Sequence, residues 1–176
     1  MNQILEHIDL INKQKFHIKN ILKEITKKQL VHKAYNTNND SDYNYLKSNE
    51  KTIGIMLKGC FGSTQTIYRS HGTWFITTLD DKILACLLVI FEIFDPWIWN
   101  VCRDVSPEYN GLAIGENLIK YTLDYLKINY PNHKKIYLWA SQKPTSRTNF
   151  YKSIGFKETG KKDRDNTPEM VFTQSP

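Results

Sequence analysis

The sequence predicts a mixed α/β domain of the α+β type, in which helices flank a mostly antiparallel central sheet. Two observations predict this class. Residues 73–105 contain three strand patterns separated by short turns, which indicates an antiparallel meander. Residues 114–161 then alternate between helix and strand patterns, and this order after a meander is typical of a mixed sheet. A helical segment precedes the meander as an N-terminal extension.

The N-terminal segment, residues 3–28, is predicted to form one or two amphipathic helices. It contains no proline or glycine, and its apolar residues recur at helical spacing. These residues are Ile4, Ile8, Ile11, Ile18, Ile21, Leu22 and Ile25. A short strand over 28–35 follows, and then a loop over 36–42, where Asn, Asp and Ser favour local side-chain hydrogen bonds. A short helix over 53–60 ends at a glycine.

The meander begins with residues 73–79, which are rich in β-branched and aromatic residues. A turn at 80–81 leads into 82–94, a strand so apolar that we expect it at the centre of the sheet. A second turn at 95–96 precedes the third strand, 97–105.

The second half of the domain begins with a helix over 114–130, whose apolar residues fall on one face. A strand over 135–140 and a helix over 145–154 follow it. Two closing strands, 156–161 and 169–173, complete the sheet.

The composition fits one globular domain over residues 1–176, with a helical part (1–70) and a core that holds the site (73–173). Three cysteines without close spacing argue against a disulfide framework and a zinc site, and indicate a reducing, cytoplasmic compartment. We see no secretion leader, and the longest apolar run, 12 residues, is too short to span a membrane. The net charge of +6 is spread along the chain, so a solvated surface is favoured over nucleic-acid binding.

The most informative stretch is the loop over 105–115, between a strand and a helix. The first N–H groups of a helix lack internal partners and attract anions, and Gly111 and Gly115 let a phosphate approach the backbone. The loop lacks the Gly-Lys-Ser/Thr ending of a P-loop, and its glycine spacing is not that of a dinucleotide fingerprint. The alternative, an ordinary tight turn packed through glycine, has nearly equal weight on this loop alone.

This stretch resembles the acetyl-CoA-binding segment of the GNAT superfamily, Gln/Arg-x-x-Gly-x-Gly/Ala after Val-x-Pro. Val105 and Pro107 match the Val-x-Pro part of this pattern. Asn110 stands in place of Gln or Arg, and Ala113 stands in place of the first glycine. The resemblance implies a cofactor, acetyl-CoA, held by Val105, Ser106, Asn110, Gly111, Leu112, Ala113, Ile114 and Gly115. It also implies that the backbone N–H groups of Val105 and Ser106 polarise the thioester carbonyl.

A second segment, Asn149 to Phe156, resembles the Phe-Tyr-x-x-x-Gly-Phe segment that closes many GNAT domains. Carried over, the resemblance makes Tyr151 the general acid that protonates the departing thiolate. The alternative is a core aromatic, because the chain has ten tyrosines. Pro144 and Arg147 replace the Asn and Ala that the family often has. Arg147 is expected to contact a cofactor phosphate, with solvated surface charge as the alternative.

The resemblance implies transfer of an acetyl group from acetyl-CoA to a primary amine, on a small molecule or a protein, by direct attack in a ternary complex. Glu92 is our candidate for the general base, because a carboxylate within an apolar strand has a raised pKa when buried; exposure to solvent is equally compatible. A catalytically weak or inactive acyl-CoA-binding or interaction module is the alternative function. The sequence leaves open the identity of the acceptor amine and whether the chain forms a homodimer.

Overall fold

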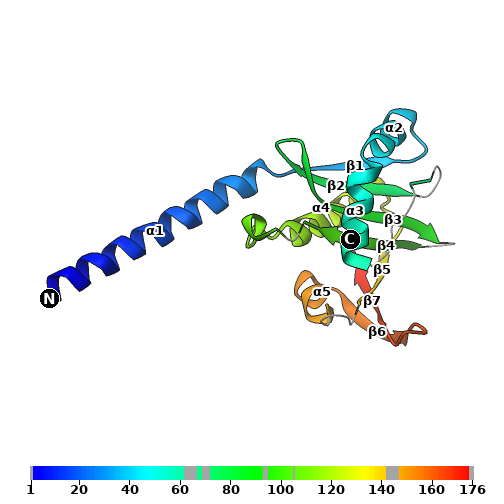
Figure 1. Ribbon diagram of the computed structural model, residues 1–176. Helices are drawn as coiled ribbons and strands as arrows, with labels where there is room; N and C mark the ends of the chain where they lie inside the picture. Colours follow the sequence, from blue (N-terminus) through cyan, green and yellow to red (C-terminus); the bar gives the residue numbers. More distant parts are fainter. Residues whose placement is uncertain are drawn as a thin grey trace.

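The computed structural model (Figure 1) describes residues 2–61, 67–68, 72–92, 95–104, 106–141 and 147–174. One seven-stranded sheet forms the centre, helices lie on both of its faces, and a long N-terminal helix projects away from it. The helices are α1 (Asn2–Gln29), α2 (Asp40–Ser48), α3 (Glu50–Phe61), α4 (Ile114–Asn129) and α5 (Thr148–Ile154), with a 3-10 turn η1 at Pro107–Tyr109. The strands are β1 (Val31–Asn36), β2 (Thr73–Leu79), β3 (Lys82–Glu92), β4 (Asp95–Arg103), β5 (Lys135–Trp139), β6 (Lys157–Lys162) and β7 (Pro168–Thr173).

The strands lie in the order β1-β2-β3-β4-β5-β7-β6. Every neighbouring pair is antiparallel except β4 and β5, which run parallel because α4 crosses over between them. This arrangement confirms the predicted mixed, mostly antiparallel sheet flanked by helices.

A hydrophobic core lies on each face of the sheet. On one face, α4 packs Leu118, Ile119 and Leu126 against β2, β3 and β5. On the other face, α3 packs Ile53 and Leu57 against the side chains of β2 and β3 that point the opposite way, since successive strand residues alternate between faces. Both faces of β3 are therefore covered, as its apolar sequence predicts.

Several bounds differ from the sequence-based expectations, and two of the differences change the type of element. The helix α2 was not predicted, because its first residues belong to the Asn- and Asp-rich stretch assigned to a loop. The side chain of Asn39 instead accepts a hydrogen bond from the Asp42 N–H and caps this helix. Strand β4 begins at Asp95, which pairs with Glu92, so 95–96 is part of the strand rather than a turn.

The N-terminal segment forms one continuous helix, α1, of 28 residues. Within the described residues, no helix is long and apolar enough to cross a membrane.

Candidate active site

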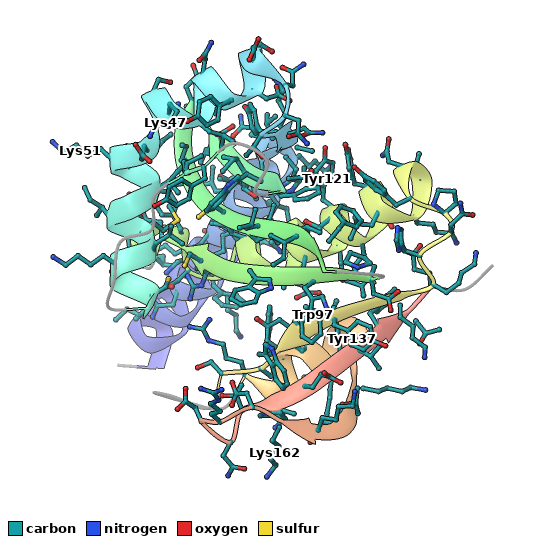
Figure 2. The ribbon with its side chains drawn as sticks, turned by 90° about the vertical axis from the view of Figure 1, so that its right-hand side faces the viewer. Lys47, Lys51, Trp97, Tyr121, Tyr137 and Lys162 are labelled. Carbon is teal, nitrogen blue, oxygen red and sulfur yellow. The ribbon has the colours of Figure 1, made fainter. Side chains whose placement is uncertain are left out.

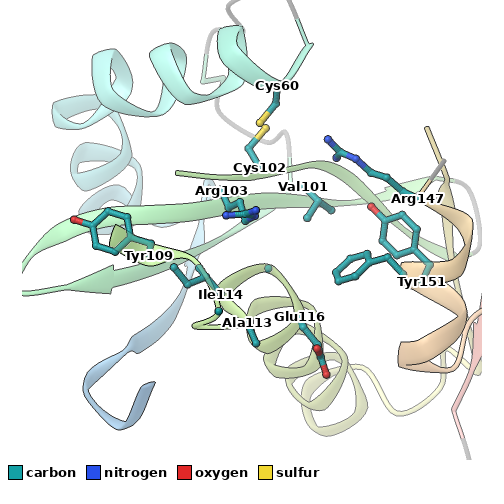
Figure 3. Close-up of a pocket in the computed structure, with 13 residues that line it drawn as sticks. Cys60, Val101, Cys102, Arg103, Tyr109, Ala113, Ile114, Glu116, Arg147 and Tyr151 are labelled. Atoms are coloured by element: carbon teal, nitrogen blue, oxygen red, sulfur yellow. The ribbon is translucent and has the colours of Figure 1, made fainter. Parts of the chain in front are cut away.

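A pocket of about 480 Å³ opens at the C-terminal end of β4, where β4 and β5 are no longer paired. The parallel strands β4 and β5 pair only at Trp97–Tyr137 and Ile98–Leu138. Beyond Ile98, β4 continues to Arg103 without a β5 partner in the described part of the chain. Ligands of α/β sheets bind at the carboxyl ends of strands where the chain reverses its direction of winding. Figure 3 shows this pocket between the end of β4, the start of α4 and α5.

The edge of β4 that borders the pocket contains a bulge. Cys86 of β3 pairs with Cys102, and Leu88 pairs with Trp99, so one β3 residue stands opposite two residues of β4, Asn100 and Val101. A bulge leaves the backbone of its extra residue unpaired, and bulges are frequent beside active sites. Val101 lines the pocket, so the bulge presents unpaired backbone to it.

The opposite wall of the pocket is the N-terminus of α4, which no side chain caps. Ala113 is the N-cap residue, its side chain makes no capping hydrogen bond, and its φ of 52° lies in the left-handed region. The N–H groups of the first turn, from Ile114 to Glu116, therefore remain open for an anion, and the helix dipole favours negative charge there. The left-handed conformation also explains why glycine suits position 113, because a Cβ destabilises it.

Two glycines keep this wall clear. A Cβ added to Gly115 would have nothing closer than Arg103 Cδ at 3.9 Å, so the space beside the first turn is open. Gly111 has a φ of 82°, which glycine adopts without strain. A Cβ there would lie 2.7 Å from Lys23 Nζ, so the ammonium group of this α1 residue rests against the loop.

Three basic side chains surround the pocket. Arg103 and Arg147 line it, from the end of β4 and the start of α5. Lys23 approaches from α1 through its contact with Gly111, another lining residue. The combination of three cations with an uncapped helix N-terminus suits a ligand that carries several phosphates.

Tyr151 lies at the other side of the pocket, on α5, and is 4% exposed. Figure 3 shows its side chain beside that of Arg147. Burial raises the pKa of the Tyr151 phenol, although the nearby charge of Arg147 and its hydrogen bond to the phenol oppose the shift. The phenol therefore stays protonated at neutral pH, as a proton donor must.

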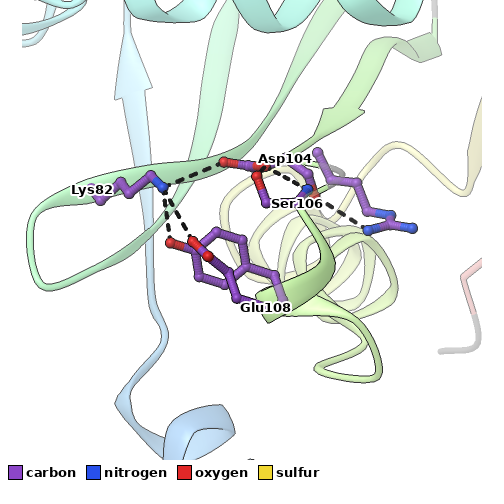
Figure 4. Close-up of polar contacts among 6 residues, drawn as sticks. Lys82, Asp104, Ser106 and Glu108 are labelled. Atoms are coloured by element: carbon purple, nitrogen blue, oxygen red, sulfur yellow. Dashed lines mark hydrogen bonds and ion pairs between the residues drawn. The ribbon is translucent and has the colours of Figure 1, made fainter.

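A polar network fixes the chain just before the 3-10 turn (Figure 4). The Asp104 carboxylate accepts hydrogen bonds from the Ser106 hydroxyl at 2.5 Å and the Ser106 N–H at 2.8 Å. Lys82 lies 3.6 Å from Asp104 and 3.7 Å from Glu108, and donates to the Tyr109 hydroxyl at 2.9 Å. The network ties the start of η1 to Lys82 at the start of β3.

We expect Asp104→Asn to be less stable at neutral pH and less sensitive to acid. Hydrogen bonds from the Ser106 hydroxyl and N–H, with Lys82 nearby, hold the pKa of Asp104 below its ordinary value. A lowered folded pKa means stability that is present at neutral pH and lost as the pH falls below about 4. Thermal melts from pH 7 to pH 3 should show a flatter decline for the variant. Asp124→Asn, at an exposed carboxylate of α4, is the control and should follow wild type.

The pocket brings together six of the predicted site residues: Gly111, Ala113, Ile114, Gly115, Arg147 and Tyr151. Val105 lies outside the described residues. Ser106 does not line the pocket, and its N–H is engaged by Asp104, so this N–H is not available to polarise a carbonyl. Leu112 is 3% exposed and belongs to the core beneath the loop. Asn110 is exposed and follows η1, and it is not a lining residue although Tyr109 and Gly111 on either side of it are.

For Glu92 the structure describes the backbone alone. Its backbone pairs with Asp95 at the start of β4, six residues before Val101. At roughly 3.3 Å per residue, this separation is about 20 Å along the strand. The structure therefore does not bring Glu92 to the lining residues, and its predicted role gains no support from the geometry.

Sequence reasoning missed several lining residues. They are Cys60, Val101, Cys102, Arg103, Tyr109, Glu116 and Phe150. Arg103 was detectable, since it is a cation just before the predicted loop. Cys60 arrives from α3, and no local pattern predicts that a helix 40 residues upstream reaches the end of β4. Neither Trp74 nor Trp97 lines the pocket. Trp74 is a core residue, 1% exposed, and Trp97 stacks on Tyr137 with ring centroids 5.1 Å apart (Figure 2).

Lys23→Gln is expected to weaken, about two- to fivefold, binding of the acetyl-CoA that the sequence resemblance implies, because a partly exposed ion pair contributes up to ~1 kcal/mol. The effect should shrink as salt rises, since screening reduces it in wild type. Titration calorimetry at low and high salt measures both changes. Lys19→Gln, at an exposed lysine of the same helix, is the matched control. Equal losses in the two variants would show that only the overall charge of α1 matters.

Comparison with known proteins gives the class to which this fold and pocket belong. The acetyltransferase (GNAT) domain family matches residues 70–158, just over half of the chain. The chain belongs to the GNAT family of acetyltransferases. No curated protein sequence matches it.

Solved structures share the fold at low sequence identity. Ard1 from Thermoplasma volcanium has a TM-score of 0.63 at 10% identity, covering 84% of this chain and 99% of that chain. Aminoglycoside 6'-acetyltransferase type Ii has a TM-score of 0.62 at 15% identity, covering 83% and 98%. N-acetylglutamate synthase from Neisseria gonorrhoeae, complexed with coenzyme A and L-arginine, has a TM-score of 0.60 at 10% identity, covering 84% and 34%. At these identities the likeness shows the fold alone.

Proposed function

We propose that the chain transfers an acetyl group from acetyl-CoA to a primary amine by direct attack in a ternary complex. The observation that carries this proposal is that one pocket contains both an uncapped helix N-terminus and a buried tyrosine. The first suits a pyrophosphate, and the second suits a leaving group that needs a proton. The coenzyme A in the Neisseria synthase structure is consistent with this ligand class.

In this proposal acetyl-CoA binds with its pyrophosphate at the first turn of α4. The N–H groups of Ile114, Gly115 and Glu116 would donate to the pyrophosphate, and Arg147 and Lys23 would pair with phosphate oxygens. Acetyl-CoA supplies the activated acetyl group. Gly111 and Gly115 allow this approach because neither places a side chain in the way.

The bulge of β4 is the candidate for stabilising negative charge on the thioester oxygen. The extra residue at Asn100–Val101 leaves backbone N–H capacity outside the ladder, and Val101 lines the pocket. Donors fixed in advance at the position of a developing charge lower the barrier without reorganisation. This assignment replaces Ser106, whose N–H is engaged by Asp104.

Tyr151 would donate its proton to the departing thiolate sulfur as the C–S bond breaks, and the proton that the attacking amine loses as the C–N bond forms would return to the phenol through solvent. The phenol lines the pocket and is held by packing, because Phe150 and Phe156 lie edge-on at 5.2 and 5.9 Å between ring centroids. A raised pKa keeps the proton on the phenol until a strong base forms beside it. We give Glu92 no part in this mechanism, because its position on β3 is far from the bulge.

The test is acetyl transfer by the purified full chain to a panel of amines, followed by mass spectrometry of the products. The panel should hold a polyamine, an aminosugar, a peptide with a free N-terminus and a lysine peptide. We expect an acetylated product with at least one class, dependent on acetyl-CoA and lost on boiling the protein. Acetyl-CoA binding without turnover on any amine would favour the alternative, an acyl-CoA-binding module. The absence of both acetyl-CoA binding and turnover would overturn the proposal.

A further inference from the structure

The long helix α1 exposes an apolar stripe that faces away from the domain. Five residues of this stripe are between 46% and 57% exposed: Ile8, Ile11, Ile18, Leu22 and Ile25. The residues near its C-terminal end that are half-buried are instead polar, and they include Lys23, which touches the loop at Gly111. A helix on the surface of a globular protein normally turns its apolar stripe inward. The orientation of α1 is the reverse.

The stripe has the spacing of a coiled-coil seam. From Ile4 to Ile25 the seam positions alternate between steps of four and three residues, an average of 3.5. The seam residues are Ile4, Ile8, Ile11, Lys15, Ile18, Leu22 and Ile25. A repeat of 3.5 sustained over three heptads indicates helix–helix pairing, because a lone helix on a globular core follows 3.6.

The length of α1 makes the same point. Its 28 residues span about 42 Å, and Figure 1 shows most of this length extending beyond the sheet. Helices in water owe most of their stability to packing of an apolar face. The stripe therefore requires a surface outside the described part of this chain.

Charge along α1 selects the orientation of the partner. Residues 2–12 carry Glu6 and Asp9 and no lysine or arginine, whereas residues 13–29 carry six lysines and one glutamate. A parallel pair would place the lysine-rich halves side by side. An antiparallel pair of identical helices keeps the two lysine-rich halves apart and so avoids their mutual repulsion.

The seam also fits an antiparallel register. With Ile11 opposite Leu22 of the partner subunit and Ile8 opposite Ile25 of the partner subunit, apolar residues face one another on both sides of the two-fold axis. Lys15 then falls next to this axis. A single lysine at a seam position fixes register at some cost in stability, and its methylene stem still packs against the neighbouring helix.

We propose that α1 pairs with α1 of a second copy of this chain as an antiparallel two-stranded coiled coil, forming a symmetric dimer. The interface is isologous, since each helix presents the same seam to the other. A membrane surface fits less well, because such helices place aromatic residues on the apolar face. Phe16 is the one Phe, Tyr or Trp in α1, and it lies about 160° from Ile18 at 100° per residue.

Sedimentation equilibrium of the full chain tests the interface. We expect dimers that dissociate on dilution, and Leu22→Glu should raise the dissociation constant tenfold or more, because it buries a carboxylate in the seam. Phe16→Glu makes the same kind of change at a side chain that is 68% exposed and outside the seam, so its dissociation constant should match wild type. Lys15→Ile should tighten the dimer. Circular dichroism and thermal melts show whether each variant keeps the fold.

Cross-linking tests the orientation. Under mild oxidation, Ile8→Cys alone should give no linked dimer, whereas the double variant with Ile25→Cys should link efficiently. Wild type treated in the same way accounts for Cys60, Cys86 and Cys102. Linking by Ile8→Cys alone would mean parallel helices and would overturn the proposal. A chain that remains monomeric at about 200 μM would also overturn it. So would equal effects of Leu22→Glu and Phe16→Glu on the dissociation constant. Binding of the monomer to anionic vesicles through the stripe would overturn it as well.

Discussion

Tyr151→Phe is expected to lower kcat at least tenfold while leaving the affinity for acetyl-CoA nearly unchanged. The variant keeps the ring that packs between Phe150 and Phe156 but removes the only proton that this side chain offers. General acids contribute ~10²–10⁴ to rates, so the loss should be plain in steady-state assays at saturating substrates. The affinity for acetyl-CoA, measured by calorimetry, separates this loss from a binding defect.

A matched control for this variant is Tyr125→Phe. Tyr125 is a half-buried tyrosine of α4 whose ring packs edge-on against Phe75 at 5.2 Å and does not line the pocket. Its loss of a hydroxyl should leave kcat at the wild-type value. The pH profile adds a second readout, because burial raises the pKa of Tyr151 and so moves the loss of the acid form to higher pH than for an ordinary tyrosine. An unchanged kcat for Tyr151→Phe would remove this residue from the mechanism.

Gly115→Asp should weaken cofactor binding about a hundredfold without harming the fold. It places a carboxylate in the first turn of α4, where a phosphate is proposed to bind. Two like charges about 5 Å apart, at an effective dielectric constant of ~20, repel by about 3 kcal/mol, which is roughly a hundredfold in affinity. The same carboxylate interacts favourably with the helix dipole, by about 0.3–1 kcal/mol. The free variant should therefore melt at or above the wild-type temperature.

The opposite signs of these two effects make the variant informative. Gly115→Ala is its control, because a Cβ at this position meets only Arg103 Cδ at 3.9 Å. Alanine is a better helix former than glycine by about 1 kcal/mol, so Gly115→Ala should be slightly more stable, and its loss of affinity for acetyl-CoA should be much smaller than that of Gly115→Asp. Comparable binding by the Ala and Asp variants would show that the phosphates lie elsewhere.

Much of the fold could be predicted because its signals are local. Strand β2 was predicted with the bounds that the structure has, and α4 begins at the predicted Ile114. The helix α2 could not be predicted in this way. The same Asn and Asp residues favour both a loop and a helix cap, and packing of Leu46 into the core decides between them.

The site was predictable where motifs are contiguous and not where it depends on register. Gly115 and Tyr151 stand in recognisable segments and meet in one pocket. The β4 bulge arises from the register between β3 and β4, which cannot be read from the sequence of either strand alone. The contact of Lys23 with Gly111 depends on the direction in which α1 leaves the domain. The prediction of Ser106 as a carbonyl-polarising donor gains no support from the geometry, since its N–H donates to Asp104 two residues earlier.

The most direct test of the central claim is the melting temperature of the purified chain with and without saturating acetyl-CoA. A ligand at about 100 times its Kd stabilises the folded state by ~2.7 kcal/mol, which for a chain of this size raises Tm by roughly 5–10 °C. We predict a rise of this size with acetyl-CoA, little or none with ATP or NAD, and little with acetyl-CoA for Gly115→Asp. An unchanged Tm at millimolar acetyl-CoA would contradict the assignment of this pocket to the cofactor.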